Sequence, residues 1–227
     1  MINALAQLGV GLYSYPEAAR LLRISRKTLD RWVRGYSLQL RSGQKAYQPV
    51  LGTPVDSFTL TFGELVELLY VRGFRNEQVP LQLIREVSEK FRGEWQTPYP
   101  FATKRFALHG RSLLLQQGDA WVEALSGQQV AFMLELGRQL THQGDFALEW
   151  RPLGEGSPVL LSPARAFGKP IDENSGAHTY VLADAFGQAS SADQVAWWYG
   201  TSEEAVLAAV RFESELKQGK SRGLVSV

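Results

Sequence analysis

YPEAARLLRISRKTLDRWVRGYSL, residues 15–38, is the stretch that decides the fold. Pro16 suits the first position of a helix, and alanines and leucines follow it on one face. Ser25 is a favourable N-cap for a second helix over residues 26–34, which Gly35 can end in a left-handed conformation. The spacing predicts a helix-turn-helix. Its shared core is expected to contain Leu22, Ile24, Leu29 and Trp32.

The second of these helices is predicted to turn a basic face outward. A helix in the major groove needs cations for phosphates and forked donors for base edges. We expect specific DNA contacts from Arg26, Lys27 and Arg31. Asp30 would accept from a cytosine or orient an arginine, and Arg34 would add phosphate affinity. A solvated surface helix is the alternative, but the joint presence of a cap, core spacing and a basic face favours DNA.

The residues after this helix alternate and predict a β-hairpin over 36–47 that turns at Ser42 and Gly43. A hairpin directly after a recognition helix is a wing. Arg41 and Lys45 lie near its tip, where they could reach a phosphate or the minor groove. Such contacts would add affinity and salt dependence more than sequence readout. A surface turn with incidental charges is an alternative of equal weight.

Composition and charge narrow the class of protein. The chain has 227 residues, 44% of them hydrophobic, and no cysteine, which excludes disulfides, thiolate metal sites and a cysteine nucleophile. Residues 1–50 carry eight Lys and Arg against two Asp and Glu, whereas the remainder carries 16 against 21. This asymmetry suggests one module that faces a polyanion. The sequence shows no secretory leader and no stretch near the about 18 apolar residues of a membrane span, so we expect a cytoplasmic protein.

The segment that follows carries a resemblance to known regulators. Thr61 and Glu64 form the pattern of a capping box at the start of a helix, and another helix is expected over residues 81–91. Together with the predicted winged helix, the run LTFGELVELLYVRGFRNEQVPLQLIREV, residues 60–87, resembles the DNA-binding domain of MerR-type regulators. More narrowly, it is similar to the N-terminal part of a group of VapB-type antitoxins.

Residues 96–161 are expected to form a small α+β middle domain with nothing that looks catalytic. Alternation between glycine turns predicts strands over residues 105–108, 112–116 and 120–123, then a helix over 127–140, then strands over 146–151 and 159–161. The aromatic residues Phe101, Phe106 and Trp121 are expected in the core or in an interface. No basic residues interleave with them as in a base-stacking platform.

Residues 162–217 carry the most specific part of the resemblance. They look like the small helical domain that ends the same antitoxin group. The matching pieces are Phe167-Gly-Lys-Pro-Ile171, Ala192-Asp-Gln-Val-Ala196, and the run from Ser202 to Glu213. The chain departs from the family over residues 174–180, which hold no arginine where the family usually has one, so the contact of that arginine is not expected here.

This C-terminal segment is expected to form a second helix-turn-helix, with Ser191 and Ser202 as N-caps. Glu203 and Glu204 would repel phosphate, so this copy is not expected to read DNA. This segment has more apolar side chains than a small domain can readily bury, so we expect it to dimerise. The alternative is that all of these side chains pack into the core of a single domain. The candidate dimerisation residues are Trp197, Trp198, Val206, Leu207, Val210 and Phe212.

The tail, residues 218–227, is short and basic and ends in apolar residues. The resemblance implies a partner for it, a PIN-like ribonuclease toxin with a metal site built from carboxylates. Leu224 and Val225 could extend along a groove of that partner, while Lys220 or Arg222 reaches its acidic groups. A flexible tail without a partner is at least as well supported.

The sequence contains none of the common enzyme motifs. It has no phosphate loop and no HExxH, and no acidic set stands at ligand spacing from His109, His142 or His178. We therefore predict a protein without catalytic residues, cofactor or metal.

Together these observations predict an α+β, mainly helical fold. The expected parts are a MerR-like winged-helix DNA-binding domain over 1–95, the middle domain over 96–161, the helical domain over 162–217 and the tail over 218–227. The predicted function is that of a type II antitoxin, which binds its operator DNA as a dimer and neutralises a PIN-like ribonuclease toxin. A stand-alone MerR-like regulator is the first alternative, and a nucleoid-associated protein without sequence preference is another.

Overall fold

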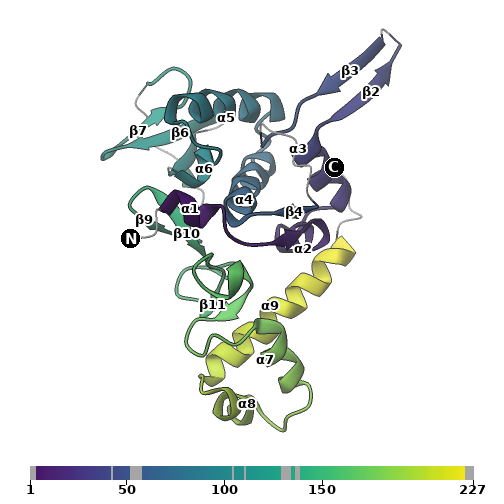
Figure 1. Cartoon of the computed structure of the whole chain (residues 1–227), viewed down its shortest axis with the longest axis vertical. Helices are drawn as coiled ribbons and strands as arrows, with labels where there is room; N and C mark the ends of the chain where they lie inside the picture. The colour runs from purple at the N-terminus through teal and green to yellow at the C-terminus, as the bar shows by residue number, and fades with distance from the viewer. Residues whose placement is uncertain are drawn as a thin grey trace. The chain divides into compact units, whose positions relative to one another are not determined.

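The computed structural model describes residues 4–41, 43–51, 58–103, 105–109, 111–128, 134–135 and 139–222. The chain divides into two compact units that together mix helices and small sheets. The helix-turn-helix unit comprises residues 13–137, and the second unit comprises residues 1–12 and 138–227. Figure 1 labels the helices and strands of both units.

The predicted helix-turn-helix is present in the first of these units. Its helices are α2 (Tyr15–Leu21) and α3 (Arg26–Arg34). Ser25 caps α3 by accepting a hydrogen bond from the Thr28 N–H at 3.0 Å, and Gly35 ends it at a φ of +73°. Of the predicted core residues, the buried ones are Leu22, Leu29 and Trp32, and Ile24 is half-buried. A short antiparallel pair flanks the motif, β1 (Tyr13–Ser14) with β4 (Thr59–Leu60).

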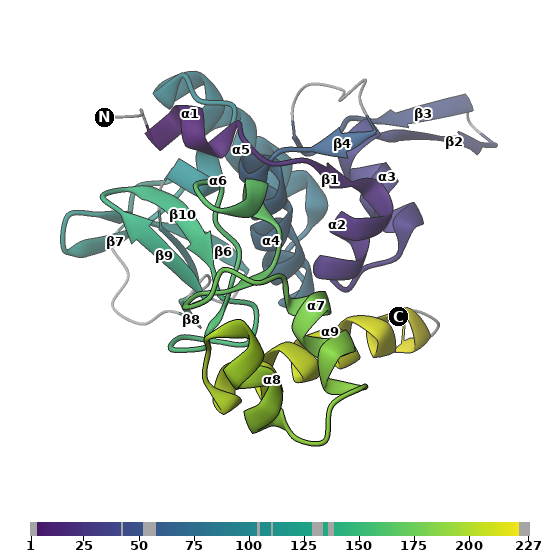
Figure 2. The ribbon, with the colours of Figure 1, turned by 60° about the horizontal axis from the view of Figure 1, so that its bottom comes forward.

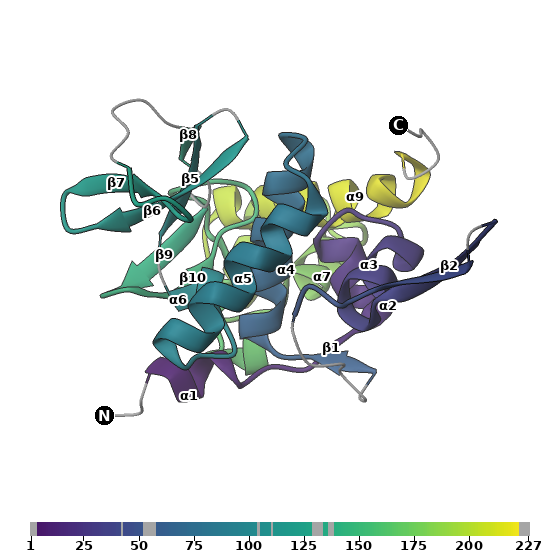
Figure 3. The same cartoon turned by 90° about the horizontal axis from the view of Figure 1, so that it is seen from above.

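The predicted hairpin follows α3 directly. It consists of β2 (Tyr36–Leu40) and β3 (Gly43–Tyr47), which pair antiparallel with Tyr36 opposite Tyr47 and Leu40 opposite Gly43. In Figures 1 and 3 the hairpin projects away from the helices of its unit. Only its root therefore touches the body of the unit, and both strands present their side chains to solvent along most of their length.

Helices and aromatic rings form the core of the helix-turn-helix unit. The helices are α4 (Phe62–Asn76), α5 (Leu81–Trp95) and the short α6 (Pro100–Thr103), which contacts both of the others. The predicted capping box is present, because the Thr61 N–H donates to Glu64 Oε2 at 2.7 Å and the Thr61 hydroxyl caps the helix in return. The rings that pack here belong to Tyr70, Phe74, Phe91, Phe101 and Phe106.

A four-stranded antiparallel sheet completes this unit, in the order β7-β6-β5-β8. Its strands are β5 (Phe106–His109), β6 (Ser112–Gln117), β7 (Ala120–Glu123) and β8 (Leu134–Glu135). The first three confirm the predicted strands. The predicted helix over 127–140 is wrong, because residues 134–135 pair with β5 and Leu140 begins a further strand. Backbone pairing with β5 outweighs the helix propensity of this run.

The second unit begins with the first residues of the chain. Helix α1 (Ala4–Leu8) packs against β10 (Phe146–Trp150). Leu8 is fully buried, and Lys169 Nζ donates to the Leu12 carbonyl at 2.8 Å. Residues 1–12 therefore pack with residues 138–227, whereas the sequence placed them with residues 13–95. A short apolar helix carries no local signal of which distant strand it will cover.

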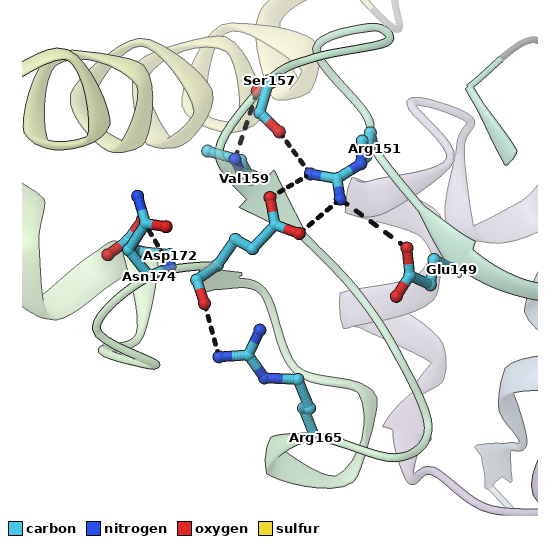
Figure 4. A network of polar contacts seen from close by, with 8 residues as sticks. Glu149, Arg151, Ser157, Val159, Arg165, Asp172 and Asn174 are labelled. Carbon is cyan, nitrogen blue, oxygen red and sulfur yellow. Dashed lines mark hydrogen bonds and ion pairs between the residues drawn. The ribbon is translucent and has the colours of Figure 1, made fainter. Parts of the chain in front are cut away.

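Short strands and a polar network hold the loops of the second unit. The strand pairs are β9 (Leu140–Gln143) with β10, and β11 (Val159–Leu160) with β12 (Ile171–Asp172). Arg151 donates from both terminal nitrogens to the Glu173 carboxylate, at 2.9 and 2.7 Å (Figure 4). These hydrogen bonds lower the pKa of Glu173. Arg165 donates to the Glu173 carbonyl at 2.7 Å. Burial opposes ionisation of Asp172, but hydrogen bonds from hydroxyl and backbone donors outweigh it and lower its pKa.

Three helices end the second unit (Figure 2). They are α7 (Thr179–Phe186), α8 (Ala192–Tyr199) and α9 (Glu203–Arg222). The predicted caps are confirmed, because Ser191 accepts from the Gln194 N–H and Ser202 accepts from the Ala205 N–H, each at 3.2 Å. Helix α9 packs against both α7 and α8. The three helices therefore share one small core.

Two of the predicted dimerisation residues are buried inside the second unit. Val206 and Phe212 are 0% and 1% exposed, because α9 turns one face toward its neighbours. The buried residues of this face follow helical spacing and are Ala205, Val206, Ala209, Phe212 and Leu216. Val206 and Phe212 are thus unavailable for an interface between folded chains, and their assignment to one is corrected.

The predicted tail is helical over its first five residues. Helix α9 continues to Arg222, so Lys220 and Arg222 lie in its last turn instead of on an extended segment. Leu224 and Val225 lie outside the described residues. Residues 218–222 are thus helical, and the flexibility of the tail stays a prediction.

Candidate nucleic-acid interface

Helix α3 carries its charged residues on one exposed face. Leu29, Trp32 and Val33 point into the unit. The predicted DNA-contacting residues of this helix are all exposed, and they are Arg26, Lys27, Asp30, Arg31 and Arg34. This burial pattern places the predicted contact residues together, at the place where a recognition helix would meet the major groove.

Arg34 is held by the protein itself. Its Nε lies 3.4 Å from Asp30 Oδ1, one helical turn earlier. Its guanidinium also lies over two rings, 5.3 Å from the centre of Tyr15 and 4.7 Å from the centre of Phe58. Asp30 therefore orients an arginine, which is one of the two roles expected of it. Arg34 thus connects the end of α3 with the rings of Tyr15 and Phe58, and it is less available to a phosphate than expected.

The root of the hairpin is fixed tightly against the end of α3. The Gly35 N–H donates to the Arg31 carbonyl at 3.1 Å, and the Val50 N–H donates to the Trp32 carbonyl at 2.8 Å. A Cβ at Gly35 would collide with the Tyr47 carbonyl oxygen, so only glycine allows β3 to approach so closely. The end of α3 and the outgoing strand of the hairpin are thus held together.

Helix α5 holds the same root from the other direction. Ser88 Oγ and Arg92 Nη2 both donate to the Val50 carbonyl, at 3.5 and 3.3 Å. Arg92 Nη2 also donates to Ser88 Oγ at 3.0 Å. Val50 therefore connects α3 with α5, and the hairpin emerges from a rigid base.

Two tyrosines stack at this base. Tyr36 and Tyr47 are opposite each other in the hairpin, and their ring centres are 4.7 Å apart with 11° between the planes. The Arg31 guanidinium lies 5.0 Å from the centre of the Tyr36 ring, and Lys45 Nζ lies 5.2 Å from the centre of the Tyr47 ring. We call these four residues the tyrosine clamp. It makes one surface of α3 and the hairpin.

The two faces of the hairpin differ in chemistry. Residues directly opposite in an antiparallel pair share a face, so Leu38 and Lys45 lie on the same face as the stacked tyrosines. The other face carries Gln39 opposite Gln44. The tyrosine face contains the basic residue and continues from Arg31 of α3. Arg41 is exposed at the end of β2, close to the turn.

Arg85 of α5 is a residue that the sequence analysis missed. Arg85 is half-buried; burial lowers the pKa of its guanidinium, and Tyr36 and Tyr47 act in the opposite direction. Its Nε and Nη2 are buried, and none of the described residues accepts a hydrogen bond from either. Arg85 thus places a partly buried positive charge near the stacked tyrosines. Residue spacing could not reveal it, because 38 residues separate Tyr47 from Arg85.

The remaining predicted site residues lie in the second unit. Trp197 and Trp198 of α8 are 82% and 48% exposed, and Leu207 of α9 is 46% exposed. Val210 is half-buried. Large exposed aromatic residues are common anchors of protein interfaces. Of the six predicted dimerisation residues, these four therefore have side chains at least partly on the surface. Self-association stays a prediction.

Two general properties of the described residues bear on the class of protein. No helix in the described part of the chain is long and apolar enough to cross a membrane. Within the same residues, no three acidic or histidine side chains cluster as metal ligands would.

Comparison with known proteins agrees with the geometry of the interface. Residues 11–87 match the model of a family described as "Putative DNA-binding HTH domain". This range contains α2, α3, the hairpin and α4, together with the start of α5. The chain therefore carries a helix-turn-helix domain of the DNA-binding class at its N-terminus.

Similarity also extends over most of the chain. It is 25% identical over 223 residues to "Uncharacterized protein Rv2308" of Mycobacterium tuberculosis (strain ATCC 25618 / H37Rv), with 91% of each chain covered. The crystal structure of Rv2018 from Mycobacterium tuberculosis is similar with a TM-score of 0.58 and 20% identity. That match covers 88% of this chain and 98% of the other, so the two proteins share a fold.

Proposed function

We propose that this chain is a transcriptional regulator that binds a specific operator through α3 and the hairpin. The observation that carries the proposal is the tyrosine clamp, which joins the exposed basic face of α3 to the basic face of the hairpin. In this proposal α3 enters the major groove, and the hairpin acts as a wing along the backbone. The excess of positive charge in residues 1–50 would supply the salt-dependent part of the affinity.

The residues of this surface take different roles. Arg26 and Lys27 stand in the first turn of α3, where recognition helices contact bases, and Arg31 stands one turn further. These three would read base edges. Arg41 and Lys45 would contact phosphates, as would Arg85 at the root of the hairpin. Arg34 is proposed mainly to brace α3, because Asp30 and two rings already hold it.

We further propose that the regulator is the antitoxin of a type II toxin-antitoxin system. The resemblance to VapB-type antitoxins at both ends of the sequence supports this role, and it implies a PIN-like ribonuclease toxin as partner. Trp197 and Trp198 offer exposed aromatic surface for protein contacts, either with the toxin or with a second copy. The proposed protein acts in the cytoplasm, without catalysis or cofactor, as a dimer or higher even oligomer.

A stand-alone regulator without a toxin is the second candidate, because the contacts that support DNA binding lie wholly within residues 13–137. The two candidates differ in what co-purifies. This protein is tagged and co-expressed with the untagged product of the adjacent gene, and the complex is isolated by pull-down and measured by size-exclusion chromatography. The experiment is then repeated with residues 219–227 deleted from this protein. A stable complex supports the antitoxin, and loss on truncation places the contact in the tail. Sizing of this protein alone as a dimer, with no partner, favours the regulator.

DNA binding itself is tested by titration. A preferred site is first selected from a random duplex pool, and binding is then compared between that site and random duplex. Arg31→Ala is expected to weaken binding to the preferred site by about 1–3 kcal/mol and binding to random duplex by less. Arg111→Ala removes an exposed arginine of the β5–β6 turn and serves as a control of equal charge. Equal loss on both duplexes for Arg31→Ala would reduce its role to a phosphate contact.

A further inference from the structure

The tyrosine clamp holds one arginine of the recognition helix in an unusual way. Arg31 and Arg34 both lie against aromatic rings, but only Arg34 is also paired with a carboxylate. Among the described residues, Arg31 forms no ion pair and its side chain donates no hydrogen bond. The ring of Tyr36 therefore holds the guanidinium while its N–H donors stay available to a ligand.

The ring that holds Arg31 is itself immobilised. Tyr36 stacks on Tyr47 at 4.7 Å across the first pair of the hairpin. That pair is locked to α3 by Gly35, whose Cβ position is closed by the Tyr47 carbonyl, and by the Val50 N–H on the Trp32 carbonyl. The platform under Arg31 is thus a rigid part of the unit, unlike an exposed side chain that moves with its own rotamers.

A platform of this kind has a consequence for recognition. An exposed arginine samples many rotamers, and ordering it on DNA reduces the affinity of each contact. An arginine that is already held over a ring loses less freedom on binding, and its N–H donors remain available to a guanine edge. Fixing the direction of the fork favours one base over others, so pre-ordering contributes to selectivity as well as to affinity.

We propose that the Tyr36–Tyr47 stack is a positioning pair that sets the sequence selectivity of Arg31 without contacting a base. The inference rests on the proposed DNA binding and goes beyond it, because it assigns selectivity to two residues of the hairpin root. Tyr36 acts through Arg31, and Tyr47 acts through Tyr36. The hydroxyl groups of the tyrosines have no part in this role, whereas the rings are essential.

The test compares two substitutions of one ring. Tyr36→Phe keeps the ring and removes the hydroxyl, and Tyr36→Leu removes the ring but keeps an apolar residue in the strand. Affinity is measured by fluorescence anisotropy for the selected site and for random duplex. Tyr36→Leu is expected to lower the ratio of the two affinities by about threefold to thirtyfold, as expected for loss of a cation–π contact. Tyr36→Phe is expected to change this ratio by less than about twofold.

A double substitution separates positioning from general support of the fold. In the Arg31→Ala background, Tyr36→Leu is expected to leave the affinity ratio unchanged, because the residue it positions is gone. A further fall in the ratio would overturn the proposal. Tyr180→Leu removes an exposed tyrosine of the second unit and serves as the matched control. Should Tyr36→Leu fail to fold in thermal melting, Tyr47→Val removes the ring behind Tyr36 and is expected to lower the ratio as well.

The outcomes distinguish this inference from the function on which it rests. Equal binding of the unmodified protein to its selected site and to random duplex would reject specific DNA binding. Specific binding by the unmodified protein together with an unchanged ratio in folded Tyr36→Leu and Tyr47→Val would reject only the positioning role.

Discussion

A buried carboxyl group in α4 leads to a prediction about pH. Glu67 is 1% exposed, and its carboxylate accepts the Ala102 N–H at 2.8 Å. Burial raises the pKa of Glu67 to about 8, although the Ala102 N–H and the positive charge of Arg92 act in the opposite direction. The folded protein therefore keeps this proton at pH values where the unfolded chain, with an ordinary glutamate pKa of 4.5, has released it.

The sign and size of the effect follow from these two pKa values. The stability that the proton confers is fully present below the unfolded pKa, and it is lost as the pH rises through the folded pKa. Each pH unit well inside this window costs about 1.4 kcal/mol, and the dependence flattens near each of the two pKa values, so between pH 5 and pH 8 the loss is about 3.5 kcal/mol. For a chain of this size that loss lowers the Tm by roughly 7–14 °C.

The prediction concerns the variant Glu67→Gln, which cannot ionise and still offers an oxygen to the Ala102 N–H. Its Tm is expected to change less than that of the unmodified protein between pH 5 and pH 8, and to be higher at pH 8. The assay is thermal melting of the full chain at several pH values, with unfolding monitored by far-ultraviolet circular dichroism. Glu94→Gln, an exposed glutamate of α5, is the control and should follow the unmodified protein. Parallel curves for Glu67→Gln and the unmodified protein would refute the reasoning.

The other predictions concern the hairpin root, a helix cap and the core of the second unit. Gly35→Ala should destabilise the protein by at least about 1–3 kcal/mol in urea unfolding, because a Cβ there is strained and meets the Tyr47 carbonyl; an unchanged midpoint would contradict this close approach. Thr61→Ala breaks the capping box and should cost about 1 kcal/mol in the same assay, whereas no loss would mean that the box is not formed in solution. Lys45→Gln should reduce the slope of log affinity against log salt concentration by about 1 for any duplex, and an unchanged slope would remove Lys45 from the interface. Phe212→Ala should cost about 3–5 kcal/mol, against less than about 0.5 kcal/mol for Leu207→Ala, and similar losses in urea would show that α9 does not bury the face described.

Signals local to the sequence predicted the helix-turn-helix well. The caps of α3, the capping box of α4 and the hairpin all depend on residues within a few positions of each other. Local hydrogen bonds and glycine conformations determine such features, so residue types at fixed spacing are sufficient to recognise them. The exposed basic face of α3 followed in the same way, because helical periodicity separates its inward residues from its outward ones.

The failures share a different origin. The predicted helix over 127–140 ignored the strand β5, with which residues 134–135 pair. Val206 and Phe212 were assigned to an interface because the sequence does not say which parts of the second unit bury them. In each of these cases the deciding neighbour is distant along the chain. Apolar residues at helical spacing show that a face will be buried but not which surface will bury it.

The sequence by itself determined that a helix with a basic outer face is followed by a hairpin that carries Lys45. Only the tertiary structure decided how these parts act together. The Val50 N–H donates to the Trp32 carbonyl at the end of α3, Arg31 lies over the ring of Tyr36, and Ser88 and Arg92 of α5 donate to the Val50 carbonyl. These relations depend on the packing of segments up to about 50 residues apart, which residue spacing does not encode. Local hydrogen bonds determine where the helices and the hairpin form. The burial of their apolar faces against one another then determines which side chains lie together on the surface that the proposed operator would meet.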